Sequence, residues 1–380
     1  MLSRNGNKMV NVVFVISRLD IGGAEKVLSD AAIGLNRDAS EYKVTMVCLY
    51  KKGRLGENLA LKGVNIYENI MRNKFDVLGI FRLARILKLI RPDILYMTAQ
   101  PITQAVCGIA SIFVNVPVKA IGFHSHNLSR RQFHKLLIDK LSLFSASVIT
   151  CVSESQRGHI ARNKNISINK IKVIYNVIDT NIFKPRPEKI AGDRYNCPLP
   201  DGSVVIGTVC SLRKEKGLDV LIKAMPEVLK NCPDAFFVIA GEGRERDKLG
   251  KMALELKVGS RIKFLGERQD IANIIPLFDI ACSSSRTENF PLSILEYMAC
   301  GKPVAATRTG GVPEMIRHGF NGILVRTESP GDLAKGILYL INNKEIGRRM
   351  AENGRRFVED NFTLDRMIQN YKDFFRGMKK

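Results

Sequence analysis

The chain has 380 residues, of which 45% are apolar and 25% are charged, so it can bury two hydrophobic cores of ordinary size. Its 59 lysines and arginines against 37 acidic residues give a net charge of +22, which predicts an anionic partner. Nucleic acid is disfavoured as that partner, because zinc-finger spacing and aromatic RNA-binding signatures are missing and only 7% of the residues are aromatic. Anionic membrane lipid or a phosphorylated substrate fits the charge better.

The sequence predicts a cytoplasmic protein without a membrane span or a disulfide framework. Its most apolar stretch outside the expected strands, residues 105–118, contains Asn115 and Pro117 and is shorter than the ~20 residues of a spanning helix. Residues 1–8 are polar and lead directly into a strand-like run, so no cleavable leader is expected. The eight cysteines are scattered singly, which is typical of reduced core residues.

Along the N-terminal half, short apolar runs alternate with amphipathic stretches, a pattern typical of βαβ units around a parallel sheet. Strands are predicted at residues 10–16, 44–50, 94–97, 118–123 and 147–152. The pattern stops at residues 175–201, where four prolines and two nearby glycines indicate an interdomain linker.

The alternation restarts after the linker. A second strand series is predicted at residues 204–209, 235–240, 262–265, 280–282, 303–306 and 322–325. Helices are expected near residues 218–230, 292–299 and 330–342. These patterns predict an α/β protein with two facing, Rossmann-like, doubly wound domains and a cleft between them. The expected boundaries are 1–185 and 186–360, followed by a C-terminal helix at 361–380 with no evident packing surface of its own.

Two segments of the N-terminal half mix basic and apolar residues. Residues 77–91 place Arg82, Arg85, Lys88 and Arg91 among isoleucines and leucines, and residues 130–140 repeat the mixture. One hypothesis is that both lie on an anionic membrane surface. The alternative is that each is a helix packed on a sheet with a solvated basic face.

The richest segment for chemistry is residues 283–314. Glu288 lies in a loop after a predicted strand, and Glu296 lies in the following helix, which Pro291 suits in its first turn. Free backbone N–H groups at that helix start can hold a diphosphate, and carboxylates can accept hydrogen bonds from sugar hydroxyls. The pattern predicts a nucleotide-sugar site, although an acidic residue such as Glu288 also simply favours a helix N-terminus.

The same segment reads Glu288-Asn289-Phe290-Pro291-Leu292 and continues to Cys300-Gly301-Lys302-Pro303, Thr309-Gly310-Gly311 and Asn321-Gly322. It resembles the signature of the retaining glycosyltransferases of family 4, which have the GT-B fold. The resemblance extends over most of the chain, to Gly22-Gly23-Ala24-Glu25, Val152-Ser153-Glu154, Val173-Ile174-Tyr175-Asn176 and Gly241-Glu242-Gly243. It implies an acceptor-side N-terminal domain, a nucleotide-sugar-binding C-terminal domain, and a last helix that crosses back to the first domain.

In the C-terminal half, the resemblance implies that Glu288 faces the donor sugar or its leaving phosphate and that Glu296 binds the ribose. Lys216 would neutralise the diphosphate, with Arg213 as a second cation, because Ser211 stands where the family usually has an arginine. Arg213 is alternatively a solvated loop charge. The remaining donor-binding residues implied are Gly241, Glu242, Gly243, Leu265, Asn289, Phe290, Pro291 and Leu292.

In the N-terminal half, Gly22 and Gly23 would let the backbone approach the donor phosphate or the acceptor, because no Cβ obstructs the turn. The family histidine near the sugar matches His124, with His126 as second choice and Asn127 beside it. Such a histidine would hydrogen-bond a sugar hydroxyl or share a proton with the acceptor. Alternatively, it is a structural residue at a strand end.

The resemblance implies a retaining transfer from a nucleotide-sugar, with UDP favoured by family frequency, in which the leaving diphosphate takes the acceptor proton. No metal and no cofactor are predicted, since no Asp-x-Asp motif stands in a fitting position. The preferred acceptor is a lipid-linked saccharide of a bacterial cell-surface polysaccharide. The alternatives are an epimerase or a phosphorylase of the same fold and a non-catalytic protein that binds anions or membranes.

Overall fold

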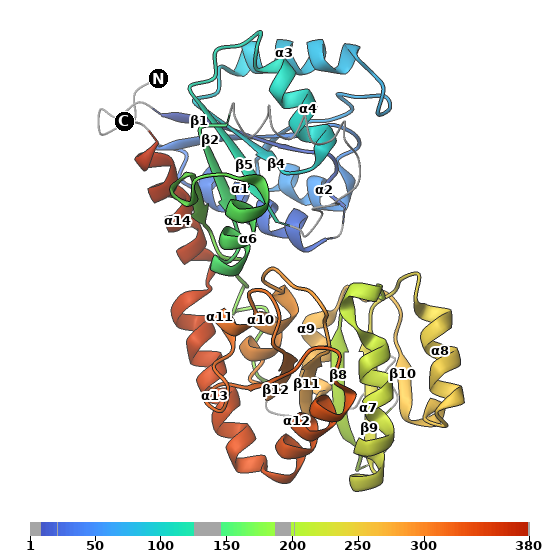
Figure 1. The fold of residues 1–380 in the computed structure, drawn as a ribbon. Helices are drawn as coiled ribbons and strands as arrows, with labels where there is room; N and C mark the ends of the chain where they lie inside the picture. The colour runs from blue at the N-terminus through green and yellow to red at the C-terminus, as the bar shows by residue number, and fades with distance from the viewer. Residues whose placement is uncertain (1–8, 21, 125–145, 187–198, 201, 379–380) are drawn as a thin grey trace. The chain divides into compact units, whose positions relative to one another are not determined.

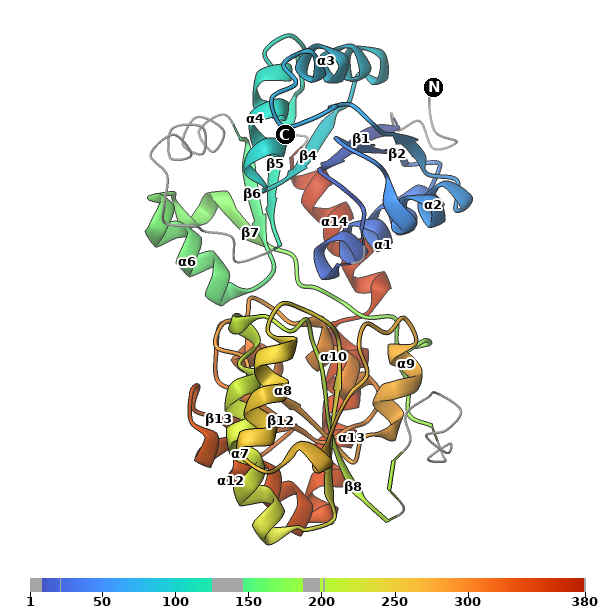
Figure 2. The ribbon, with the colours of Figure 1, turned by 90° about the vertical axis from the view of Figure 1, so that its right-hand side faces the viewer.

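The computed structural model (Figures 1 and 2) describes residues 9–20, 22–124, 146–186, 199–200 and 202–378. The chain forms two compact units, residues 1–176 with 364–380 and residues 177–363. Each unit is a parallel sheet with helices on its faces. The prediction of two Rossmann-like, doubly wound domains is confirmed. Among the described residues, none of the helices has both the length and the apolar character that crossing a bilayer requires.

The sheet of the first unit has seven strands in the order β3-β2-β1-β4-β5-β6-β7. In chain order they are β1 (Val10–Ile16), β2 (Tyr42–Cys48), β3 (Asn65–Tyr67), β4 (Ile94–Thr98), β5 (Val118–Phe123), β6 (Val148–Cys151) and β7 (Ile171–Val173). Most of these strands are buried apolar runs, as expected for a sheet covered on both faces. Strand order reverses between β1 and β4, which makes their carboxyl ends the natural place for a ligand.

The helices of the first unit are α1 (Gly23–Arg37), α2 (Gly53–Leu61), α3 (Leu78–Ile90), α4 (Pro101–Ala110), α6 (Glu154–Lys164) and the C-terminal α14 (Leu364–Gly377), with a short 3-10 turn, η1 (Ile168–Lys170). The five strands predicted in this half are present, with β2 starting two residues earlier than expected. The sequence analysis did not predict β3 and β7, each of which has three residues.

The second unit has a six-stranded sheet in the order β10-β9-β8-β11-β12-β13. Its strands are β8 (Val204–Val209), β9 (Ala235–Ala240), β10 (Ile262–Phe264), β11 (Ile280–Ser283), β12 (Val304–Thr307) and β13 (Ile323–Val325). Its α-helices are α7 (Leu218–Asn231), α8 (Arg246–Glu255), α9 (Ile271–Ile274), α10 (Leu292–Ala299), α11 (Val312–Met315), α12 (Pro330–Asn342) and α13 (Lys344–Asn361). The 3-10 turns are η3 (Lys214–Lys216), η4 (Gly259–Arg261) and η5 (Ile275–Leu277).

The last helix belongs to the first unit although it follows the second in sequence. Tyr371 of α14 is fully buried and packs against Phe14 and Tyr96, with ring centroids 6.3 and 6.0 Å apart. Lys372 contacts the Asp38 carboxylate at 2.6 Å, beyond the end of α1. Helix α14 therefore packs on α1 and the adjoining sheet of the first unit.

The chain passes into the second unit between Asn176 and Val177, earlier than the predicted boundary after residue 185. Ile178 pairs with Thr363 in an isolated bridge, and the Phe183 carbonyl accepts a hydrogen bond from Arg355 at 2.8 Å. Residues 187–198 of the predicted linker, residue 201, and the basic segment 130–140 lie outside the described residues.

Candidate functional site

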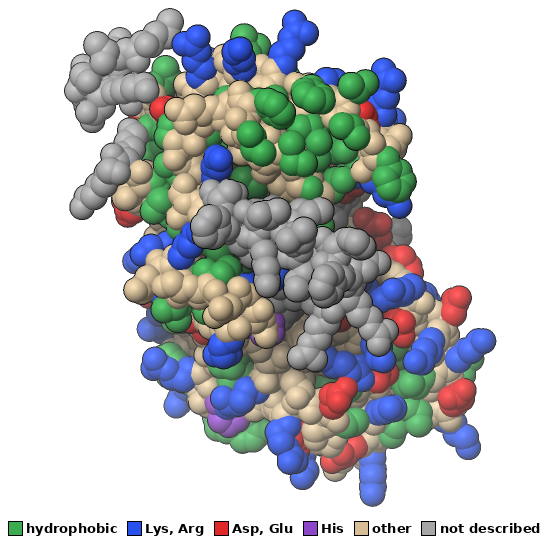
Figure 3. Space-filling view, turned by 45° about the horizontal axis from the view of Figure 1, so that its top comes forward, with side chains coloured by type: hydrophobic (Ala, Val, Ile, Leu, Met, Phe, Trp, Pro, Cys, Tyr) green, Lys and Arg blue, Asp and Glu red, His purple; other side chains and the backbone are tan. Residues whose placement is uncertain are grey.

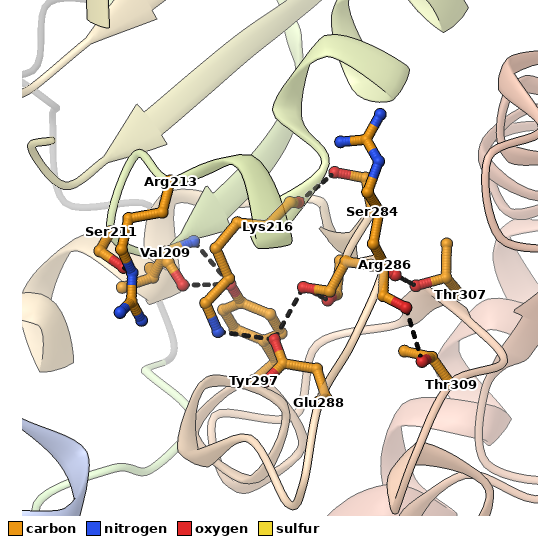
Figure 4. Close-up of polar contacts among 12 residues, drawn as sticks. Val209, Ser211, Arg213, Lys216, Ser284, Arg286, Glu288, Tyr297, Thr307 and Thr309 are labelled. Atoms are coloured by element: carbon orange, nitrogen blue, oxygen red, sulfur yellow. Dashed lines mark hydrogen bonds and ion pairs between the residues drawn. The ribbon is translucent and has the colours of Figure 1, made fainter. Parts of the chain in front are cut away.

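An ion pair joins two loops at the carboxyl ends of neighbouring strands in the second unit (Figure 4). Lys216, at the end of η3 after β8, contacts the Glu288 carboxylate after β11 at 2.6 Å. Ser285 donates a second hydrogen bond to the same oxygen at 2.7 Å. The side chains of Lys216 and Glu288 are only 18% and 10% exposed, so water screens the pair weakly. A cation and a carboxylate predicted from different motifs are thus in direct contact.

Backbone geometry places Lys216 opposite Glu288. Gly217, which follows it, has φ +61°, and a Cβ there would lie 2.1 Å from the Ser284 carbonyl oxygen. The hydroxyl of Ser284 donates to the Lys216 carbonyl at 3.1 Å. Only glycine accepts both this conformation and this close approach, so the two loops meet through their backbones.

Arg286 ties the two loops together a second time. Its guanidinium binds the Asp219 carboxylate with two hydrogen bonds of 2.7 and 2.8 Å and donates to the Lys214 carbonyl at 2.9 Å. The Arg286 N–H donates to the Glu215 carbonyl at 2.8 Å. The hydrogen bonds between the Arg286 guanidinium and the Asp219 carboxylate lower the pKa of Asp219 and raise the pKa of Arg286. The sequence analysis did not single out Arg286 and Asp219, because their positions along the chain do not reveal that the two loops meet.

The other side of the Glu288 loop rests on the turn after β12. Thr307 and Thr309 donate to the carbonyls of Ser285 and Arg286 at 2.6 and 2.9 Å. Gly310 has φ +51°, and a Cβ there would lie 1.6 Å from the Glu288 carbonyl oxygen. The Thr-Gly-Gly sequence is therefore a support on which the Glu288 backbone lies.

Helix α10 begins directly after this loop. Pro291 is its N-cap, one position before the first turn in which the sequence placed it, and no side chain among the described residues caps the helix. Leu292 starts the helix, and Glu296 lies half-buried in its second turn. Uncapped N–H groups and the helix dipole favour an anion at this end.

Two further residues of the loop point inward. Asn289 is buried, and its side-chain oxygen has no hydrogen-bond partner in the described parts of the chain. Phe290 is also buried and packs on Phe362, with ring centroids 5.3 Å apart, so it supports the loop. A buried acceptor without a partner is unfavourable unless a ligand or water supplies a donor.

Two glycines bring the loops after β8 and β9 together. Gly241 has φ +145°, and a Cβ there would lie 1.9 Å from the Cys210 carbonyl oxygen, while a Cβ on Gly243 would lie 2.4 Å from that of Leu212. Glu242 between them is exposed. Leu265, after β10, donates its N–H to the Ile239 carbonyl at 2.9 Å and is partly exposed.

The predicted second cation, Arg213, is the exposed N-cap of η3. Its Nε donates to the hydroxyl of Ser211 at 3.0 Å, so it contacts the residue whose place it was expected to take. In Figure 4 its guanidinium extends from the same loop as the Lys216 amine.

In the first unit, His124 follows β5. Tyr96 lies within hydrogen-bonding distance of both His124 Nε2, at 3.2 Å, and Thr150, at 2.6 Å. Burial lowers the pKa of His124 to about 4 and raises that of Tyr96 to about 12. His124 is therefore a neutral imidazole near pH 7, and its buried Nδ1 has no partner among the described residues. His126 and Asn127 lie outside the described residues.

Gly22 and Gly23 lie at the start of α1, with no backbone conformation at Gly22 that requires glycine. Gly22 is the N-cap of α1 with extended backbone, φ −158°, and Gly23 is the first residue of the helix. A Cβ on Gly22 would meet only the end of the Glu25 side chain, at 2.2 Å, which can move aside. Gly22 therefore has a backbone conformation that other residues can also adopt.

Two family models match the chain, one on each half. "Glycosyltransferase Family 4" matches residues 21–182, and "Glycosyl transferases group 1" matches residues 193–357. The chain belongs to the family 4 glycosyltransferases of the GT-B fold. The sequence resemblance to that family is confirmed.

Known proteins agree with this family. N-acetyl-alpha-D-glucosaminyl L-malate synthase of Bacillus anthracis is 26% identical over 62% of this chain and 61% of that protein. An uncharacterized glycosyltransferase of Methanocaldococcus jannaschii is 32% identical over 63% of this chain and 62% of that protein. The matches thus span about three fifths of these relatives' length. The structure of Anabaena Alr3699/HepE in complex with UDP and glucose has a TM-score of 0.83 at 24% identity, covering 97% of this chain and all of that chain, and shares the fold.

In this GT-B chain, the structure brings together some of the predicted residues. Lys216 and Glu288 touch, and Arg213, Asn289 and Leu292 lie in the same loops or at the adjoining helix start. Gly241, Glu242 and Gly243 lie on the neighbouring loop, which bonds to the Lys216 loop through Leu212 at 2.9 Å. His124, Gly22 and Gly23 belong to the other unit.

Proposed function

We propose that the chain is a retaining glycosyltransferase that moves a sugar from a nucleotide-sugar, a UDP-sugar, onto a saccharide acceptor. The observation that carries the proposal is the Lys216–Glu288 pair beside the uncapped start of α10. A diphosphate has the charge to bind an amine and free helix N–H groups, and a sugar has the hydroxyls to bind a carboxylate. UDP is preferred because the similar Anabaena protein has been solved with UDP and glucose.

We assign Lys216 the role of stabilising the negative charge that develops on the diphosphate as the bond to the sugar breaks, with Arg213 as a second cation. Glu288 lies against the sugar or its leaving phosphate, and Glu296 binds the ribose hydroxyls.

The remaining residues of the site line the nucleotide-sugar. The side-chain oxygen of Asn289 accepts a hydrogen bond from the nucleotide-sugar. Gly241, Glu242, Gly243 and Leu265 line the nucleotide, and Phe290, Pro291 and Leu292 shape the phosphate end.

Retention follows if the acceptor attacks from the face that the diphosphate leaves. The anomeric C–O bond to phosphate breaks, the acceptor oxygen bonds to the same carbon, and the acceptor proton goes to the leaving phosphate oxygen. The positive charges of Lys216 and Arg213 would make the reaction independent of a divalent metal. His124, neutral near pH 7, can contribute a hydrogen bond to a sugar hydroxyl rather than a positive charge.

For the acceptor, we propose a lipid-linked saccharide of a cell-surface polysaccharide, on the inner face of the cell membrane. The high net charge of +22 supports this place, because that face of a membrane is anionic.

A thermal-shift series with UDP, GDP, ADP and their sugar conjugates tests the donor, on wild type, Glu296→Gln and a control, Glu255→Gln, which is exposed on α8. A ligand at one hundred times its Kd stabilises by about 2.7 kcal/mol. UDP should stabilise wild type and the control with or without EDTA, and Glu296→Gln much less. Stabilisation by GDP or ADP alone corrects the donor, and a response to none of them contradicts the proposal.

The products then test the reaction. Proton NMR of the glycosylated acceptor should show the anomeric configuration of the donor. Inversion would contradict retention, and turnover of the donor into an isomer without acceptor would identify an epimerase instead.

A further inference from the structure

A cluster of exposed apolar side chains lies on α3 and the adjoining end of α4 in the first unit. Half of the sixteen large hydrophobic residues exposed in the described parts of the chain belong to it: Phe75, Val77, Leu78, Phe81, Leu89, Ile109, Ile112 and Phe113. We call this set the α3–α4 face. Figure 3 shows hydrophobic side chains gathered on the face of the first unit where these helices lie, with Lys and Arg around them. Single exposed apolar residues are common, but such a cluster marks an interaction surface.

The cluster is one continuous surface rather than two helix edges. The rings of Phe81 and Phe113 lie 5.7 Å apart, which joins the first turn of α3 to the segment after α4. Ile112, next to Phe113, is 76% exposed, and Phe75, before α3, is 79% exposed.

Helix α3 already has a full set of core contacts on its other side. Leu83 and Leu87 are completely buried in the core of the first unit, together with Ile70 and Met71. The sequence offered a packed helix or a membrane surface as alternatives for this segment. The structure shows packing through one side of α3 and leaves an apolar side free, so the core contacts do not account for the α3–α4 face.

Positive charge surrounds this face. Arg72, Lys74, Arg85, Lys88 and Arg91 are all exposed, and none of them takes part in an ion pair within the described residues. Between residues 71 and 91 the sequence has one acidic residue, Asp76, and it is paired with Arg82. Arg85 and Leu89 follow Phe81 at four-residue spacing, so the apolar and basic side chains share one side of α3.

We propose that the α3–α4 face docks on an anionic lipid bilayer, with its phenylalanine and isoleucine side chains at the boundary of the acyl chains. Arg85, Lys88 and their basic neighbours would contact lipid phosphates. Apolar residues between unpaired cations match a surface with negative headgroups over a hydrocarbon layer. A second copy of the chain fits poorly, because a symmetric contact would bring two sets of five cations together.

Vesicle co-sedimentation tests this face, with phosphatidylcholine alone and with added phosphatidylglycerol. Wild type should bind the anionic vesicles, and salt should weaken the binding. Leu89→Glu/Ile112→Glu and Arg85→Glu/Lys88→Glu should each reduce the partition by at least about tenfold, since one cation near an anionic surface is worth about fivefold.

Each variant has a matched control at residues outside the α3–α4 face. Leu61→Glu/Leu254→Glu replaces two leucines that are 86% and 72% exposed, close to the exposure of Leu89 and Ile112. Lys251→Glu/Arg356→Glu reverses two exposed charges on α8 and α13. Both controls should bind vesicles like wild type, and circular dichroism checks that all variants are folded.

Equal loss in variants and controls would mean that net charge alone drives binding, and absence of binding to anionic vesicles would reject the proposal. A dimer that Leu89→Glu/Ile112→Glu converts to monomer, without vesicle binding, would assign the face to a second copy. UDP binding measured on the same samples separates this inference from the proposed function. Loss of vesicle binding with intact UDP binding concerns the face alone.

Discussion

The two units carry polar groups at the carboxyl ends of their sheets, but they hold them in opposite ways. In the first unit, Tyr96, His124 and Thr150 form a neutral network in which burial shifts each resolved pKa away from the charged form. In the second unit, Lys216 meets Glu288 in an ion pair. The comparison shows that one fold, used twice, can bury groups as neutral donors and acceptors or hold them charged.

The charged arrangement depends on backbone contacts. Gly217 and Gly310 each bring a neighbouring carbonyl so close that a side chain would collide with it. The neutral network instead depends on aromatic packing, in which Tyr371 of α14 covers Tyr96. Substitutions in the second unit should therefore change the catalytic rate and the strain of the loops. Substitutions in the first unit should change how stability depends on pH.

The largest expected effect is on the charged pair. Lys216→Met keeps a long side chain but removes the amine, so kcat should fall about 10²–10³-fold, the scale of losing one group that stabilises developing negative charge. Lys214→Met is the control, because its exposed side chain lies on the same turn. Steady-state kinetics with a UDP-sugar measures both. Equal losses in the two variants would remove Lys216 from its proposed role.

The next effect separates close contact from backbone conformation. Gly310 and Gly319 both have positive φ, +51° and +79°, but a Cβ on Gly310 meets the Glu288 carbonyl and one on Gly319 meets nothing within 4 Å. Gly319→Ala should cost about 1 kcal/mol and Gly310→Ala at least about 2 kcal/mol more. Urea unfolding of both variants gives these values. Similar costs would show that the loop under Glu288 yields easily.

A smaller effect should come from the cross-link between the two loops. Arg286→Lys keeps the charge but cannot form the two parallel bonds to Asp219, so Lys216 should be less well positioned and kcat should fall about tenfold. KM for the donor should change less than kcat. A double-mutant cycle with Asp219→Asn should show coupling, because the two residues act through one contact. Additive effects would contradict this positioning role.

The smallest effect concerns the neutral network. Because burial holds the pKa of His124 near 4, below its ordinary 6.5, the unfolded chain binds the proton more readily. The stability that His124 contributes is present above pH 6.5 and is lost as the pH falls toward 4. His124→Gln should remove that loss, so its stability relative to wild type should improve by about 1 kcal/mol between pH 7 and about pH 5.5. An unchanged difference would mean that His124 is protonated without cost.

Much of the fold was predictable from the sequence, because buried parallel strands are continuous apolar runs. The strands 10–16, 118–123 and 204–209 were predicted with the bounds that the structure has. The three-residue strands β3 and β7 were missed although the equally short β10 and β13 were predicted, because a strand of this length is defined mainly by its pairing with a neighbour.

The sequence by itself determined which side chains are available for chemistry and, through the Glu288 and Gly241 segments, the family. Only the tertiary structure decided that Lys216 touches Glu288, that Arg286 binds Asp219, and that Lys372 of α14 pairs with Asp38. These contacts join residues far apart in the chain. The exposed apolar side of α3 was likewise identified only from the structure, which shows that the opposite side of the helix packs in the core. A helical pattern in the sequence shows which residues are apolar, but it does not show which of them a neighbouring element covers.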